Sequence, residues 1–200
     1  MMPRHLIAFA ALALVALPVF ATAQEPTRLI RRQLPDTVTV DGIPCGPTGR
    51  AYAEFHPSER LASCPIVQPM TLAGHDLPVE TWVLLEEDGT LRGAWLPQNI
   101  LLAGHLCRGT GYKGWSVRFH PSGALSMCYL AEVATTDGVP CQRGTFWIEI
   151  RGGTNSSVGF HENGRLSRCQ AARDFTRDGI RIRKWDVVRL DSTGRLLTGG

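Results

Sequence analysis

Hydrophobic and polar residues alternate over short stretches of this chain, and turn-forming residues separate the stretches. In WSVRF, an extended strand would place Trp115, Val117 and Phe119 on one face and Ser116 and Arg118 on the other. Five further runs of strand length are rich in β-branched and aromatic residues: AYAEF at Ala51, WVLL at Trp82, TFWIEI at Thr145, SSVGF at Ser156 and DVVRL at Asp186. No stretch of the sequence shows the apolar period of an amphipathic helix. The pattern predicts an all-β protein of short antiparallel strands.

Three segments repeat one strand–turn–strand pattern, and each ends on a cysteine. They are FHPSERLASC from Phe55, FHPSGALSMC from Phe119 and FHENGRLSRC from Phe160. Each is preceded by a motif in which a glycine stands three positions before another cysteine, namely DGIPC, AGHLC and DGVPC. Two further units fit this frame without cysteine: AGHDL followed by LEEDGTLRGA, and DGIRI followed by LDSTGRLLTG. The Gly, Asn, Ser and Pro residues in these turns favour hairpins.

The units begin at regularly spaced glycines, which are Gly42, Gly74, Gly104, Gly138 and Gly179. Their spacing of roughly 30 to 40 residues is typical of repeat architectures. We therefore expect residues 41–200 to form one β-repeat domain, with one hairpin per unit stacked into a twisted antiparallel meander or solenoid-like array. A closed β-barrel is the alternative. Residues 24–40 precede the first unit and are expected to form a flexible arm.

The six cysteines follow the repeat in pairs. Where the first position of a unit is Leu77 or Ile182, the later position is Ala94 or Gly199 instead of cysteine. Positions that change together between units are expected to touch, so the sequence predicts three disulfides, one in each cysteine-containing unit. The predicted pairs are Cys45 with Cys64, Cys107 with Cys128 and Cys141 with Cys169.

A metal site is the competing interpretation, because a histidine follows the repeated phenylalanine at His56, His120 and His161. The sequence contains no CxxC or HxxxH motif, so the spacing favours disulfides, and we predict neither a metal nor a cofactor.

The first residues have the features of a signal peptide. A basic Arg4 precedes the apolar run from Leu6 to Phe20, and Ala21-Thr22-Ala23 offers a small-x-small cleavage site. The alternative is a membrane anchor, but the run is short for a membrane span, so we expect no stable membrane insertion. Residues 1–23 are therefore predicted to be removed near Ala23, leaving a periplasmic or secreted protein in which disulfides persist.

Charge is distributed unevenly along the chain. Residues 24–107 carry six Arg or Lys against ten Asp or Glu, whereas residues 108–200 carry fourteen against eight. Without residues 1–23, and so without Arg4, the formal net charge is about +2, which is too small to indicate a nucleic-acid partner. The basic second half would favour an anionic partner, and a solvated arginine-rich surface is the alternative interpretation.

The segments from Phe119 to Gly138 (FHPSGALSMCYLAEVATTDG) and from Phe160 to Cys169 (FHENGRLSRC) resemble MORN-variant repeats, which are also found in YwqK-type antitoxin-like proteins. The resemblance extends over residues 41–197. It implies β-hairpin repeats that serve as an interaction surface. The sequence departs from the family in lacking a regular Tyr-x-Gly core, in its longer units and in its paired cysteines, so no antitoxin function is inferred.

The sequence contains no nucleophile elbow, zinc-hydrolase helix, phosphate loop or dinucleotide fingerprint, so no catalytic residue is predicted. The hypothesis is a non-enzymatic binding or structural module of the cell envelope that holds a protein or glycan on one face of its sheet. An exposed aromatic row would support it, drawn from Tyr52, Trp82, Trp95, Tyr112, Trp147 and Trp185. The alternative is an exported hydrolase whose histidines and carboxylates meet only in the folded protein.

Overall fold

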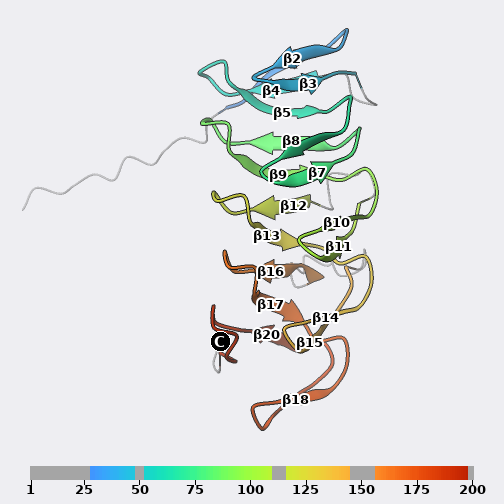
Figure 1. Cartoon of the computed structure of the whole chain (residues 1–200), viewed down its shortest axis with the longest axis vertical. Helices are drawn as coiled ribbons and strands as arrows, with labels where there is room; N and C mark the ends of the chain where they lie inside the picture. Colours follow the sequence, from blue (N-terminus) through green and yellow to red (C-terminus); the bar gives the residue numbers. More distant parts are fainter. Residues whose placement is uncertain (1–27, 48–51, 110–115, 145–155, 198–200) are drawn as a thin grey trace, which may run out of the picture.

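The computed structural model describes residues 28–47, 52–109, 116–144 and 156–197, and within these ranges the protein is all-β (Figure 1). Twenty strands form one ten-stranded antiparallel sheet and five separate two-stranded hairpins. This confirms the fold class that the alternating pattern predicts. No helix in the described part of the chain has the length and hydrophobicity needed to cross a membrane.

The large sheet is a meander in which every neighbouring pair of strands is antiparallel. Its strands are, in spatial order, β1 (Ile30–Gln33), β4 (Tyr52–Phe55), β5 (Leu61–Pro65), β8 (Trp82–Leu85), β9 (Leu91–Trp95), β12 (Ser116–Phe119), β13 (Leu125–Cys128), β16 (Val158–Phe160), β17 (Leu166–Gln170) and β20 (Val187–Arg189). The sheet is open, with β1 and β20 at its two ends. The closed-barrel alternative is therefore wrong.

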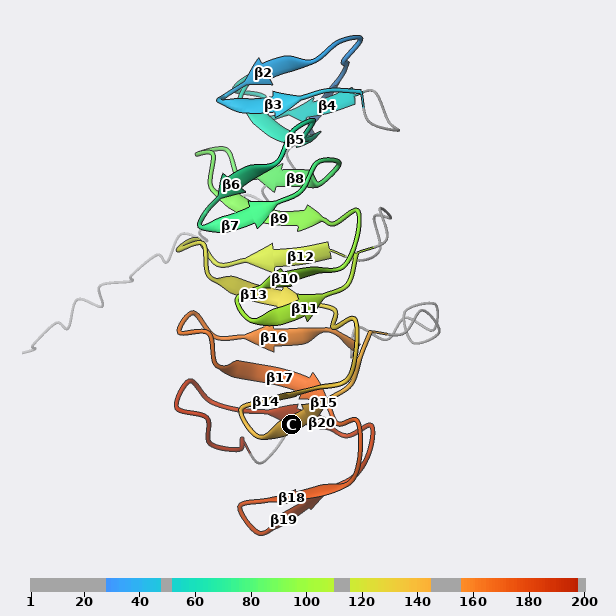
Figure 2. The ribbon, with the colours of Figure 1, turned by 45° about the vertical axis from the view of Figure 1, so that its right-hand side comes forward.

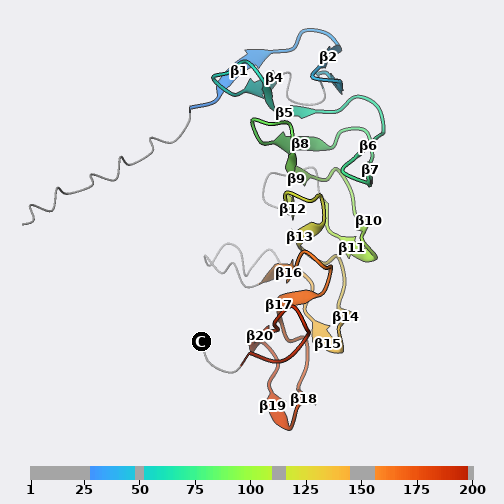
Figure 3. The ribbon, with the colours of Figure 1, turned by 60° about the vertical axis from the view of Figure 1, so that its left-hand side comes forward.

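The five small hairpins lie along one side of this sheet (Figures 2 and 3). They are β2 (Val38–Val40) with β3 (Ile43–Cys45), β6 (Met70–Leu72) with β7 (His75–Leu77), β10 (Ile100–Leu102) with β11 (His105–Cys107), β14 (Ala134–Thr136) with β15 (Val139–Cys141), and β18 (Phe175–Arg177) with β19 (Ile180–Ile182). Each of the first four units thus contributes two hairpins, and the last contributes β18–β19 and strand β20, which is followed by the isolated bridge of Leu190 to Leu196. The expectation of one per unit is wrong, because the residues before each cysteine form a hairpin of their own.

The unit-start glycines occupy the turns of these small hairpins. In the first, Asp41 has a φ of 48° and Gly42 a φ of 80°, the pair of positive angles that the favoured two-residue turn requires. Ala73 and Ala103 take the first of these positions in the second and third units, at φ values of 50° and 48°. An alanine side chain is strained there, so these two turns depend on the packing around them.

Part of the expected N-terminal arm forms strands, at Ile30–Gln33 and Val38–Val40. Strand β1 pairs with β4 along the sheet edge, and β2 pairs with β3. The Arg31 guanidinium lies 2.8 Å from a Glu54 oxygen and 4.1 Å from the centre of the Tyr52 ring. The arm therefore covers the edge of β4 and itself forms the end strand of the sheet.

The hydrophobic core lies between the sheet and the small hairpins. In every unit, alternate residues of the sheet strands point into it and are buried, as Val83 and Leu85 are in β8. The hairpins contribute Cys45, Leu77, Cys107, Cys141 and Ile182 to the same cluster. One core, shared by all units, holds the array together, because a lone hairpin cannot bury its own apolar face.

The connections between hairpin and sheet differ between units with and without cysteine. Residues 78–81 and 183–186 link the small hairpin to the next strand of the sheet in the units without cysteine. In the other units, residues 46–51, 108–115 and 142–157 separate the small hairpin from the next described strand, and these stretches lie partly outside the described residues. Paired cysteines therefore stand in the units where more residues separate the two.

Candidate binding groove

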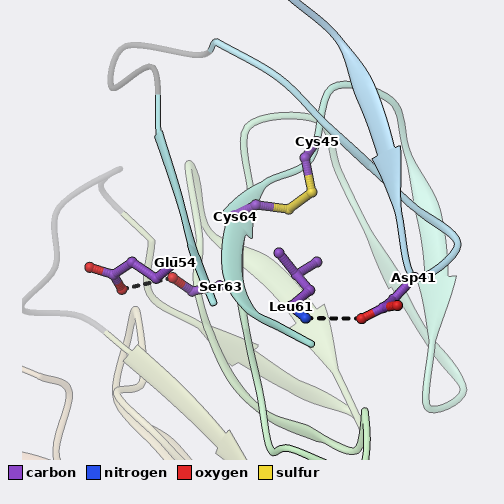
Figure 4. Close-up of a disulfide and its surroundings, with 6 residues drawn as sticks. All are labelled: Asp41, Cys45, Glu54, Leu61, Ser63 and Cys64. Carbon is purple, nitrogen blue, oxygen red and sulfur yellow. Dashed lines mark hydrogen bonds between the residues drawn. A yellow bond between two sulfur atoms is a disulfide. The ribbon is translucent and has the colours of Figure 1, made fainter. Parts of the chain in front are cut away.

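Two of the three predicted cysteine pairs are disulfides. Cys45 is joined to Cys64 and Cys141 to Cys169, and each bond ties a small hairpin to the return strand of the sheet hairpin in its own unit. Figure 4 shows the first of these bonds. All four cysteines are buried in the core. The disulfides thus lie on the hairpin side of the sheet and fasten each hairpin to it.

The third pair differs from the prediction, because Cys107 and Cys128 are two buried thiols rather than a disulfide. A hydrogen bond with Cys128 and burial both raise the pKa of the Cys107 thiol far above its ordinary range. Isolated bridges place Cys107 opposite Leu130 just as Cys45 lies opposite Ile66. The backbone therefore brings the third pair together as the alignment expects, while the third covalent link stays a prediction.

The three histidines after the repeated phenylalanine connect successive units. Each lies at the tip of a sheet hairpin, and its Nε2 atom donates a hydrogen bond to a carbonyl oxygen of the next unit. The pairs are His56 with Leu85 at 3.2 Å, His120 with Phe160 at 3.0 Å and His161 with Leu190 at 2.9 Å. The histidines repeat because this contact repeats. Among the described residues, no group of three or more His, Cys, Asp or Glu could hold a metal ion.

Two further histidines lie in the small hairpins, beside a hollow of about 290 Å³ that Glu162 also lines. His75 stacks on Phe119 and bonds the Gly123 carbonyl oxygen at 2.8 Å. His105 stacks on Phe160, and burial lowers its pKa although the charge of Asp137 opposes the shift. Within the described ranges, no histidine is hydrogen-bonded to a carboxylate, so the pair that the hydrolase alternative needs is not formed there.

The side of the sheet away from the hairpins, which we call the open face, is polar. Figure 4 shows Glu54 and Ser63 on the side of β5 opposite the disulfide. The strand register places one residue of each strand in a single row across this face. In order from β1 to β20, the row reads Arg31, Glu54, Ser63, Leu84, Gly93, Arg118, Met127, Gly159, Arg168 and Arg189.

The first half of this row is hollowed into a groove of about 400 Å³, which we call the open-face groove. Its apolar lining comes from Leu29, Ala62, Leu84, Gly93 and Trp95. Its polar lining comes from Glu54, Ser63, Arg92 and Arg118. Pockets of this size and mixed lining are typical of sites for small molecules or short polymer segments.

The charges in the open-face groove do not cancel. Glu54 is compensated, because one of its oxygens accepts a hydrogen bond from Arg31 at 2.8 Å and the other accepts one from Ser63 at 2.8 Å. Arg92 lies 3.6 Å from Glu86 at the exposed margin. Arg118 is exposed and forms no ion pair within the described ranges. The groove therefore has an excess of positive charge.

An aromatic row borders the groove, although it is less exposed than expected. The ring centres of Tyr52 and Trp82 are 4.9 Å apart, and those of Trp82 and Trp95 are 5.8 Å apart. Tyr52 and Trp82 are buried, so of these three only Trp95, which is half-buried, faces the groove. Trp185 is 44% exposed but lies in the last unit, away from this row. Tyr112 and Trp147 lie outside the described residues.

Sequence reasoning names Trp95 but misses Glu54, Arg92 and Arg118. The repeat itself contains the signal that would have found them. Positions that face the core are alike from unit to unit, whereas Glu54, Leu84 and Arg118 stand at equivalent positions of the open face and share no chemistry. A position that varies inside a regular repeat is a candidate for function.

Comparison with protein-family models, with curated proteins and with solved structures finds no match for this chain. The resemblance to MORN-variant repeats therefore stays a prediction.

Proposed function

We propose that this chain is an exported, non-enzymatic binding protein of the cell envelope that holds a glycan in its open-face groove. The observation that supports this most is the groove itself, where a half-buried indole, hydroxyl and carboxylate groups and two arginines lie around one hollow. Apolar surface with a few well-placed polar groups is what a sugar ring requires, because the ring has apolar C–H faces and a polar rim.

The two sides of the sheet differ in a way that fits separate structural and binding roles. The hairpin side contains the disulfides and the shared core, so it provides rigidity. The open face contains residues that differ from unit to unit, which a purely structural repeat would not need. Rigid scaffolds with variable surface positions are typical of repeat proteins that bind other molecules.

Export is part of the same proposal. Disulfides are typical of oxidising compartments, and the two in this protein fit a periplasmic or secreted location. N-terminal sequencing of the protein recovered from outside the cytoplasm tests this directly. A chain that begins at Gln24 supports export, and a full-length chain in the cytoplasm contradicts it.

The binding proposal is tested by probing an array of cell-envelope glycans with the full chain and two variants. Trp95→Ala removes the indole that faces the groove, and Trp185→Ala removes an exposed indole elsewhere as the matched control. The expected result is a set of glycans that the parent chain and Trp185→Ala retain and Trp95→Ala does not. Retention that is equal for all three proteins, or no retained glycan, would contradict a glycan site in the groove.

A further inference from the structure

We infer that the open-face groove selects acidic sugars, with a carboxylate held between Arg92 and Arg118 and the sugar ring packed on Trp95. This inference rests on the proposed function and names the ligand class of the same groove. It commits to a carboxylate-bearing saccharide, and acidic peptides and neutral sugars become outcomes of the test.

The two arginines lie close together because of the local backbone. Arg118 in β12 is directly opposite Gly93 in β9, and adjacent strands are about 5 Å apart. Arg92 is the extra residue of a bulge, since Leu84 pairs with Gly93 while Leu85 pairs with Leu91. The bulge sets Arg92 beside the same glycine that faces Arg118, and that glycine has no side chain to separate them.

This juxtaposition has a charge cost that an anion would relieve. Like charges on neighbouring strands are destabilising when no opposite charge lies between them. Glu54, the carboxylate in the groove, already accepts hydrogen bonds from Arg31 and Ser63. Glu86 lies 3.6 Å from Arg92 at the exposed margin, so within the described ranges the charge that is left without a partner is that of Arg118. A ligand carboxylate is therefore complementary to Arg92 and Arg118, and guanidinium groups bind carboxylates through paired hydrogen bonds.

The aromatic wall adds a requirement for a ring. Trp95 follows Gly93 by two residues and so lies on the same face of β9, next to the arginines. Its ring is backed by buried Trp82, which is itself backed by Tyr52. A side chain supported in this way loses little freedom on binding, so it offers a preorganised platform for the C–H face of a pyranose.

The other arginines of the open face lack this combination. Arg168 in β17 lies directly opposite Arg189 in β20, so this register also brings two positive charges together. They do not line the open-face groove, and neither lies beside Trp95. Arg189 is exposed and therefore offers a charge-matched control on the same face.

The test is calorimetric titration of the full chain with two acidic disaccharides, digalacturonate and dimannuronate. Digalactose serves as the neutral counterpart, and the dipeptide Asp-Asp supplies two carboxylates without a ring. We expect at least one acidic disaccharide to bind with a dissociation constant of about 1 mM or tighter, and both digalactose and Asp-Asp to bind at least ~10-fold more weakly.

The variants locate the site. Arg92→Gln and Arg118→Gln should each weaken acidic-disaccharide binding by about 10-fold, Trp95→Ala should weaken it by a similar factor, and Arg189→Gln should leave it within about 2-fold. Because all four side chains are at least partly exposed, thermal unfolding can show that each variant remains folded.

Three results would overturn the inference. Equal binding of Asp-Asp, or an equal loss on Arg189→Gln, would show that only surface charge is recognised. A second result would be that digalactose binds as tightly as the acidic sugars and loses that binding in Trp95→Ala. This result would support a glycan site in the groove and contradict its selectivity for acidic sugars. Absence of binding by both acidic disaccharides would refute acidic-sugar recognition, and the glycan array would then decide separately whether the proposed function survives.

Discussion

The two faces of the ten-stranded sheet follow different rules. On the hairpin side, equivalent positions repeat almost without change, as Phe55, Leu85, Phe119, Phe160 and Leu190 do at the end of each outgoing strand. On the open face, the preceding positions are Glu54, Leu84, Arg118, Gly159 and Arg189. The repeated side must fill one continuous core, where a change of volume is costly. These five positions on the open face do not fill that core, so they can vary without disrupting it.

This difference explains why the repeat is easy to see and the function is not. Core packing and turn geometry impose the same residues on every unit, and those residues dominate any comparison between units. The groove depends on residues that occur once each. Its chemistry therefore lies in the departures from the repeat rather than in the repeat.

Two adjacent residues of β12, one on each face, should differ most in their effect on the free energy of unfolding. Phe119→Ala removes a buried ring from the core and should lower the free energy of unfolding by about 3–5 kcal/mol. Arg118→Ala, one position earlier and exposed on the open face, should change it by no more than about 0.5 kcal/mol. Urea denaturation measures both. Similar losses for the two variants would show that the open face is also structural.

The disulfides provide the next largest effect. Replacing both Cys141 and Cys169 with alanine should cost about 2–4 kcal/mol, because the bond closes a loop between residues 28 apart in sequence and so restricts the unfolded chain. Chemical denaturation without reductant is the measurement.

The matched control replaces both Cys107 and Cys128 with alanine. These residues are buried to the same degree but form two thiols, so the loss should be smaller, at about 1–2 kcal/mol. The opposite outcome is that the two double variants lose the same free energy of unfolding and that non-reducing peptide mapping finds Cys107 linked to Cys128. Together these two results would establish the third disulfide that the repeat predicts.

The hairpin turns should allow a modest gain in stability. Ala103 has a φ of 48°, a conformation that glycine adopts without strain, so Ala103→Gly should raise the free energy of unfolding by about 0.5–1 kcal/mol. The same replacement at Ala134, a strand residue of β14 without a positive φ, should lower it. A loss at both positions would show that the Ala103 side chain contributes packing that outweighs its strain.

The smallest predicted effect is a pH dependence that arises at His105. Burial holds its pKa in the folded protein below the ordinary value near 6.5, so the unfolded chain takes up a proton first as the pH falls. His105 therefore has no effect on stability above about pH 7 and lowers it as the pH falls through 6.5.

Thermal unfolding at pH 8 and pH 5.5 measures this effect, and His105→Gln is the variant to compare. The drop in melting temperature between the two pH values should be smaller in the variant than in the parent chain. An identical drop in both proteins would assign the pH dependence to other groups.

The sequence predicts the all-β class, the unit starts and the cysteine pairs, because each depends on local chemistry or on positions that change together. It does not predict the small hairpin of each unit, since the hairpin from Val38 to Cys45 is recognisable mainly by its turn and has few strand residues. It also misses the pairing of β1 with β4, which depends on Arg31 meeting Glu54 across a gap in sequence.

Alternation, turn glycines and paired cysteines act over a few residues or within one unit, so they predict a β-repeat with disulfides in its core from the chain alone. The side chains that meet on the open face follow from the tertiary structure instead. The groove brings together Leu29, Glu54, Arg92 and Arg118, which lie in different units or before the first one. Strand register and the bulge at Arg92 set that arrangement, and both follow from pairing between distant segments rather than from any local pattern.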